Sequence, residues 1–152
     1  MTPKSLLRHP LVISPVAEFT SGFFKEVIDE NREAGGVRRL LFCSGKIYYD
    51  LIASRKESGH VALVRIEQFY PYPEKQIAEI LEGYSQAVEI VWTQEEPLNM
   101  GGWTFMQPRL GGQVRPGQQF RAIGRTPAAS PASGSLKVHQ REQEEIIRKS
   151  LA

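Results

Sequence analysis

The sequence has few cysteine and histidine residues and no long apolar run. It has one cysteine in 152 residues, which excludes a disulfide within the chain, and His9, His60 and His139 are too far apart to form a short metal-binding motif. No apolar run approaches the roughly 20 residues that a membrane span requires, and no signal-peptide core is apparent. We therefore expect a cytoplasmic protein with no metal site and no membrane segment.

An excess of charge of one sign is also lacking. The 19 Lys and Arg residues stand against 17 Asp and Glu residues, which leaves a net charge of +2 spread along the chain. Nucleic-acid-binding domains usually gather basic residues on one face, so no nucleic-acid partner is expected. What is present is a 41% hydrophobic content, which in a chain of this length suffices for one full core.

Short β-rich apolar runs alternate with amphipathic stretches from residue 37 onward. The patterns predict strands over 37–43, 61–67, 88–92 and 120–123, and helices over 46–57, 73–84 and 135–151, with 97–110 helical only in its middle. Nearly continuous apolar strands are typical of a sheet that is covered on both sides. The sequence thus predicts an α/β fold, a doubly wound, mostly parallel sheet with helices on both faces.

The first residues do not follow this alternation. Residues 1–13 are expected to form an N-terminal arm or linker, and residues 14–152 a single α/β domain. Ser14 and Pro15 carry the signature of a helix start, with Ser as the cap and Pro in the first turn. The apolar positions that recur at helical spacing after this start are Val16, Phe19, Phe23, Val27 and Ile28. One amphipathic helix is therefore predicted, ending before Gly35 and Gly36.

Polar residues follow the predicted strands, where ligands bind in open parallel sheets. Ser44 and Gly45 would place backbone N–H groups at a helix N-terminus, and Lys46 would add a positive charge, an arrangement that favours an anion. Gln68 follows the second strand and Arg125 follows the last. Ser44, Gly45, Lys46, Gln68 and Arg125 form a candidate anion-binding site at the strand ends.

A plainer interpretation of these strand ends competes with the anion site. No Walker motif and no dinucleotide fingerprint surrounds the first strand end, so its turn can simply cap a helix. Lys46 would then be solvated, and Arg125 would pair with Glu95 or Glu96. Cys43 ends an apolar strand and is expected to be a buried small hydrophobe. The residues alone predict no catalytic constellation.

Five segments, taken in order, resemble the 2-oxoglutarate dehydrogenases, the thiamine-dependent decarboxylating components of the 2-oxoglutarate dehydrogenase complex. These segments are Lys4–His9, Cys43–Asp50, Arg65–Pro71, Gln94–Asn99 and Gly124–His139. The resemblance runs from Thr2 to about Ser150 and is to the C-terminal domain of that family, which is similar to the transketolase C-terminal domain.

The resemblance implies an oxidoreductase that decarboxylates 2-oxoglutarate and passes succinyl to a lipoyl group in the citric acid cycle. Such enzymes bind thiamine diphosphate and Mg²⁺ between two earlier domains, so no catalytic or cofactor-binding residue is assigned in this chain, and the chain alone is predicted to be inactive. The implied partners are the other domains of the parent chain, a homodimer partner and the lipoyl-bearing succinyltransferase component. The domain would support the dimer and bind a nucleotide or acyl-CoA effector. The alternative is a stand-alone α/β nucleotide-binding regulatory module.

Overall fold

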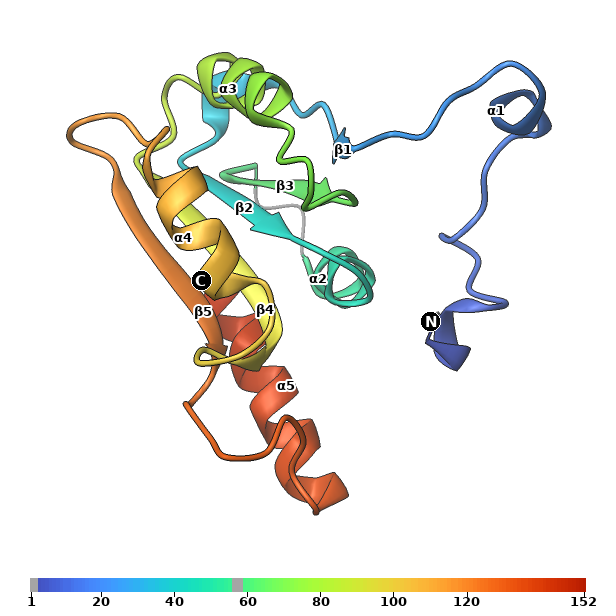
Figure 1. The fold of residues 1–152 in the computed structure, drawn as a ribbon, viewed down its shortest axis with the longest axis vertical. Helices are drawn as coiled ribbons and strands as arrows, with labels where there is room; N and C mark the ends of the chain where they lie inside the picture. Colours follow the sequence, from blue (N-terminus) through green and yellow to red (C-terminus); the bar gives the residue numbers. More distant parts are fainter. Residues whose placement is uncertain (1–2, 56–58) are drawn as a thin grey trace.

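A mixed sheet organises the chain in the computed structural model, which describes residues 3–55 and 59–152 (Figure 1). Its strands are β1 (Val27–Asp29), β2 (Arg39–Cys43), β3 (Val61–Ile66), β4 (Glu89–Pro97) and β5 (Gln119–Arg125). Their order across the sheet is β1-β3-β2-β4-β5. All neighbouring pairs are parallel except β1 and β3, which run antiparallel. The predicted mostly parallel α/β fold is confirmed.

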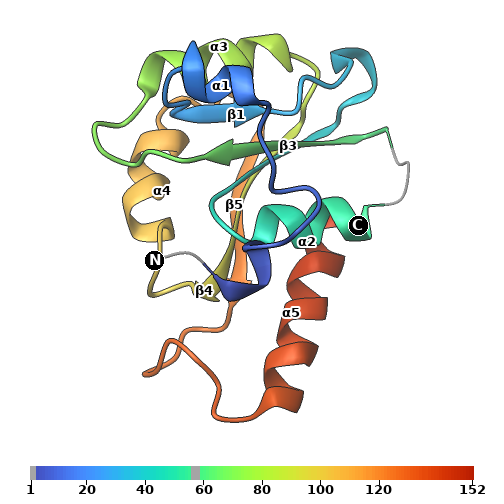
Figure 2. The ribbon, with the colours of Figure 1, turned by 90° about the vertical axis from the view of Figure 1, so that its right-hand side faces the viewer.

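Helices cover both faces of this sheet (Figure 2). The α-helices are α1 (Val16–Thr20), α2 (Ile47–Ser54), α3 (Glu74–Gly83), α4 (Trp103–Gly111) and α5 (Leu136–Leu151), with short 3₁₀ turns at Lys4–Leu6 and Ala34–Gly36. Side chains of α3 and α4 pack into one apolar cluster and those of α2 and α5 into another. Helix α1 belongs to neither layer.

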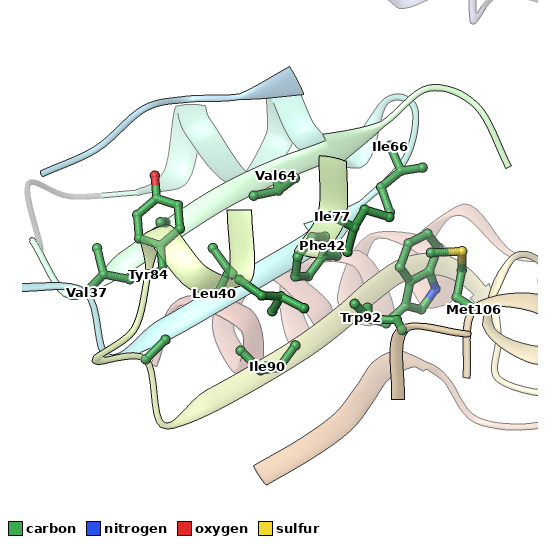
Figure 3. Close-up of a cluster of buried hydrophobic side chains, with 14 residues drawn as sticks. Val37, Leu40, Phe42, Val64, Ile66, Ile77, Tyr84, Ile90, Trp92 and Met106 are labelled. Carbon is green, nitrogen blue, oxygen red and sulfur yellow. The ribbon is translucent and has the colours of Figure 1, made fainter. Parts of the chain in front are cut away.

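The two apolar clusters follow from the alternation of side chains along the strands. Leu40 and Phe42 of β2 point into the cluster that holds Ile77 of α3 (Figure 3). Leu41 and Cys43 of the same strand point into the other cluster. All five side chains are fully buried. A strand that is buried on both faces needs an unbroken apolar run, which is the pattern that the sequence shows at these positions.

The predicted long helix at the N-terminus is wrong. Helix α1 ends at Thr20, and Val27 and Ile28 lie in β1, paired with β3. The backbone folds back at Gly22, where a Cβ atom would lie 2.3 Å from the carbonyl oxygen of Glu18. A helix without a packing partner is marginal in water, whereas a sheet edge offers backbone hydrogen bonds to β-branched residues. Val27 and Ile28, which the helical pattern assigned to the helix, therefore lie in the sheet.

Apart from the end of β4, the other described boundaries lie near their predicted positions. Strand β4 continues past the expected end at Trp92 to Pro97, and helix α4 runs through Pro108. Helix α5 begins as predicted, with the Ser135 hydroxyl accepting the Val138 N–H at 3.5 Å. The predicted end of the second helix, at residue 57, lies outside the described residues.

The extension of β4 is tied to the next helix by the side chain of Gln94, which is 3% exposed. Its Oε1 accepts hydrogen bonds from Trp92 Nε1 and from the backbone N–H of Trp103, both at 2.9 Å. Its Nε2 donates to the carbonyl oxygens of Pro97 at 3.0 Å and Met100 at 2.8 Å. One buried amide thus connects the end of β4, the following turn and the start of α4.

Replacing this amide with an apolar side chain of similar size should destabilise the domain. Gln94→Leu leaves the buried Trp92 Nε1–H, the partly buried Trp103 N–H and several carbonyl groups without their partner, for which we expect a loss of about 2–4 kcal/mol in the free energy of unfolding. Urea denaturation followed by circular dichroism measures this loss. The exposed Gln140 supplies the control, because Gln140→Leu should change the same free energy by no more than about 0.5 kcal/mol. Equal midpoints for the two variants would contradict this account.

Candidate functional site

The carboxyl ends of β2, β4 and β5 meet at one edge of the sheet, as the parallel order requires. After β2 the chain turns through Ser44 and Gly45 into α2. Gly45 has a φ of +74°, in the left-handed region that favours glycine. Lys46 occupies the cap position of α2 and forms no side-chain cap hydrogen bond. The turn thus leads directly into α2, and the lysine side chain extends toward the neighbouring strand end.

The Lys46 ammonium lies between two carboxylates. Its Nζ is 2.5 Å from Asp50 Oδ2, one turn along α2, and 2.9 Å from Glu95 Oε1, at the end of β4. Partial burial lowers the pKa of Lys46, but the hydrogen bonds to these two carboxylates outweigh burial and leave the pKa raised above its ordinary value. Lys46 is therefore charged and ion-paired, and the interpretation that it is solvated is wrong.

Arg125, at the end of β5, is held by several partners. Its Nε lies 3.0 Å from Glu142 Oε2 of α5, and its Nη1 donates to the backbone carbonyl of Glu95 at 2.5 Å. Nη2 contacts His139 Nδ1 at 3.1 Å and Gln143 Oε1 at 3.2 Å. Because the guanidinium can only donate, His139 Nδ1 is the acceptor in this contact. The expected pairing with a carboxylate of Glu95 or Glu96 is replaced by one with Glu142.

Gln143 of α5 connects these two cations. Its Nε2 donates to Asp50 Oδ2 at 2.9 Å and to Glu95 Oε1 at 3.0 Å, while its Oε1 accepts from Arg125. We call the following residues the carboxyl-edge cluster: Lys46, Asp50, Glu95, Arg125, Glu142 and Gln143. Two cations and three carboxylates give the cluster a formal charge of 2 − 3 = −1. An anion that reaches Lys46 must displace a carboxylate.

The structure does not bring Gln68 into the carboxyl-edge cluster. Gln68 follows β3, which is separated from β5 by β2 and β4. At the usual strand spacing this places it roughly 14 Å from the end of β5. Its Nε2 donates to the carbonyl oxygen of Pro71 at 3.0 Å and so supports its own loop.

A group that the sequence analysis missed lies on the other side of Lys46. Arg65 of β3 stacks on the rings of Tyr48 and Tyr49, with its guanidinium carbon 4.8 and 5.3 Å from their centroids. Its Nη1 donates to the Tyr49 hydroxyl at 2.5 Å, and its Nε lies 2.6 Å from Glu67 Oε1. The signal was present in the sequence, because an arginine inside an otherwise apolar strand requires partners.

These aromatic and charged side chains line a cavity of about 590 Å³ between the sheet edge and the N-terminal residues. Leu6, Leu11 and Ile13 form part of its wall on the N-terminal side. His9 approaches Tyr49, with ring centroids 5.6 Å apart. The predicted anion site therefore borders a cavity with an aromatic wall, a feature that the motifs did not indicate.

Cys43 is fully buried, as predicted. Burial raises the pKa of its thiol from 9.0 to about 12, and the nearby Arg65 lowers it only in part. The thiol is therefore neutral at physiological pH and is not a nucleophile, since reactivity belongs to the thiolate.

The burial of Cys43 predicts slow chemical modification. The native protein should react with a thiol reagent such as dithionitrobenzoate only as fast as it opens, and unfolding in urea should release one fast-reacting thiol per chain. Absorbance of the released thiolate follows both reactions. Rapid reaction of the native chain at neutral pH would show that this strand end is accessible.

In residues 3–55 and 59–152, no group of three or more His, Cys, Asp or Glu side chains is placed to hold a metal ion. Within the same ranges, no helix has the length and apolar character needed to cross a bilayer.

The five-stranded sheet, its two helical layers and the polar carboxyl edge define the class of domain. It is an α/β domain of the transketolase C-terminal kind. Residues 13–151 match the family described as 2-oxoglutarate dehydrogenase C-terminal. The chain belongs to this family.

Its relatives give the same result. The chain is 45% identical to the 2-oxoglutarate dehydrogenase E1 component of an Exiguobacterium species, over 100% of the chain and 17% of that protein. It is 42% identical to the E1 component of Cupriavidus necator, over 100% of the chain and 16% of the relative. It is 44% identical to the E1 component of Geobacillus kaustophilus, over 99% of the chain and 16% of the relative. The chain thus spans about one sixth of the length of these relatives.

Proposed function

We propose that this chain acts as the supporting C-terminal domain of a 2-oxoglutarate dehydrogenase E1 component. The parent enzyme would decarboxylate 2-oxoglutarate and pass succinyl to a lipoyl group in the citric acid cycle. The observation that carries the proposal is the match of essentially the whole chain to E1 components and to their C-terminal family. This match favours the enzyme domain over a stand-alone regulatory module.

The proposal places the chemistry outside this chain. The chain spans only about one sixth of the length of its E1 relatives. By the family resemblance, thiamine diphosphate and Mg²⁺ would be held by other domains of the parent chain, and no reaction step is assigned to residues here. The proposed partners are those domains, a second E1 subunit and the lipoyl-bearing succinyltransferase component, and the proposed location is the cytoplasm.

The first test is the activity of the isolated chain. With thiamine diphosphate, Mg²⁺ and 2-oxoglutarate we expect no reduction of an artificial electron acceptor, because the proposal assigns no cofactor-binding residue to this chain. The full-length E1 component of Geobacillus kaustophilus serves as the positive control in the same assay. Turnover by the purified 152-residue chain would contradict the proposal that other domains of the parent chain carry the chemistry.

We also propose that the edge around Lys46 binds the phosphate groups of an effector, an adenine nucleotide or an acyl-CoA. Support comes from the Gly45 turn, from the lysine at the start of α2, and from the adjoining cavity of about 590 Å³ with Tyr48 and Tyr49 in its wall. A phosphate carries more charge than one carboxylate and can compete for the lysine with Asp50 and Glu95. Arg125 would supply a second cation after its ion pair with Glu142 breaks.

Titration with acetyl-CoA and with AMP, followed by calorimetry, tests this site. Lys46→Ala and Arg125→Ala should each raise the Kd by about tenfold or more, because each removes a cation and leaves its carboxylate partners to repel the ligand. Arg148 is also ion-paired to a glutamate but is exposed on α5, so Arg148→Ala is the matched control and should leave the Kd unchanged. Unchanged affinity in both test variants, with their circular dichroism spectra intact, would contradict the site.

A further inference from the structure

One side chain that contacts Arg125 stands outside the carboxyl-edge cluster. His139 lies near the start of α5, partly buried, and its Nδ1 is 3.1 Å from Arg125 Nη2. Since a guanidinium has no acceptor, Nδ1 must offer a lone pair, and the single proton of the neutral ring is on Nε2. This contact therefore requires an uncharged imidazole.

A second proton on the imidazole would change what Arg125 contacts. An N–H at Nδ1 would oppose the guanidinium N–H, and two positive charges would meet where the Arg125 side chain is only 9% exposed. Burial strengthens their repulsion, because less water screens it. The charged ring would also attract Glu142, one turn further along α5, which now pairs with Arg125. Both effects release Arg125 from its present partners.

The ion pair between Arg125 and Glu142 suits such an exchange. The two groups lie 3.0 Å apart, yet the Arg125 Nε–H forms no hydrogen bond within the described residues, because it is not directed at the carboxylate oxygen. The Glu142 side chain is 36% exposed. Its carboxylate can therefore turn toward a charged imidazole and remain in contact with water.

The charged groups that face this part of α5 come from β4, β5 and α2. They are Glu95, Arg125, Lys46 and Asp50. On α5 itself, Lys137 and Arg141 are exposed and lie two residues from His139, on other sides of the helix. Carboxylates ordinarily titrate near roughly pH 4 and lysine and arginine above roughly pH 10, whereas histidine ordinarily titrates between about pH 5 and 8. The histidine is the group whose charge changes near neutral pH.

We propose that His139 is a pH-sensitive switch that controls whether Arg125 is available to an anion at the carboxyl edge. The neutral ring holds the guanidinium, and the protonated ring releases it. Protonation also adds one positive charge, so the formal charge of the cluster together with His139 changes from −1 to 0. The inference rests on the anion site proposed above and adds its regulation. Anion affinity should rise as the pH falls, and by reciprocity a bound anion should favour the protonated ring.

NMR spectroscopy of the ¹⁵N-labelled chain observes the switch without a ligand. At pH 8 the His139 ring should carry its proton on Nε2, and between pH 8 and 5.5 the Arg125 Nε–H resonance should shift with the same midpoint as the ring. His139→Asn keeps an acceptor near Arg125 but does not titrate, so in this variant the resonance should stay constant over the same range. A ring that titrates while the Arg125 resonance of the unmodified chain does not change would overturn the proposal.

Binding of inorganic sulfate measures the consequence, because sulfate keeps its charge over this range. At constant ionic strength, its Kd should fall by about fivefold or more from pH 8 to pH 5.5. The titrations use a His9→Asn background, since His9 contacts Tyr49 beside the same edge and is also a histidine. In this background, His139→Asn should keep the Kd at pH 8 and lose the pH dependence. His60→Asn, at an exposed histidine next to Arg39 and Glu89, is the matched control and should retain it.

The outcomes separate the switch from the anion site on which it rests. Sulfate binding whose pH dependence persists in His139→Asn would overturn the switch and leave the site intact. A chain that binds no sulfate at any pH would overturn both. If His139→Asn does not fold, the titration of Arg125 in the unmodified chain still decides the proposal.

Discussion

The burial of both faces of β2 is the constraint on which the rest of this domain depends. Leu40 and Phe42 fill one apolar layer and Leu41 and Cys43 the other, so a shift of one residue would exchange the two layers. The same register sets Cys43 beside Thr93 of β4. Two layers of buried side chains therefore decide which polar residues meet at the carboxyl edge.

Helix α5 is positioned by polar contacts as much as by its apolar side. At the carboxyl edge, Gln143 bonds to the carboxyl-edge cluster. At the other end, Arg39 donates to the carbonyl oxygens of Lys149 and Ser150 at 3.3 and 3.0 Å, a charge placement that suits a helix C-terminus. The Ser150 hydroxyl lies 3.2 Å from that of Thr93. The helix is thus held at both the carboxyl and the amino ends of the parallel strands, although most of its residues are polar.

The sequence predicted the elements whose pattern is local. The apolar runs of β2 and β3, the capping serine before α5 and the buried Cys43 could all be recognised from neighbouring residues. It failed at residues 21–29, because the choice between a helix and an edge strand depends on β3, which lies more than thirty residues further along the chain.

The charges of the candidate site were harder still to anticipate. The strand ends predicted Lys46 and Arg125 at the same edge, and in the structure both side chains contact Glu95, at its carboxylate and its carbonyl oxygen respectively. Their partners Glu142 and Gln143 lie on α5, whose mostly polar sequence gave no indication of these contacts. Arg65 was overlooked because its tyrosine partners lie on α2, and only the parallel pairing of β2 and β3 brings them together. Contacts between layers carry no local signature.

This distribution of contacts has a consequence for any ligand at the carboxyl edge. Asp50 and Glu95 accept hydrogen bonds from both Lys46 and Gln143, so an anion that takes the lysine from them also changes what holds Gln143. Gln143 in turn contacts Arg125. If the proposed anion binds at Lys46, we therefore expect the occupancy of the edge and the position of α5 to be coupled through the shared carboxylates, and by reciprocity a contact that moves α5 should alter the affinity for the anion.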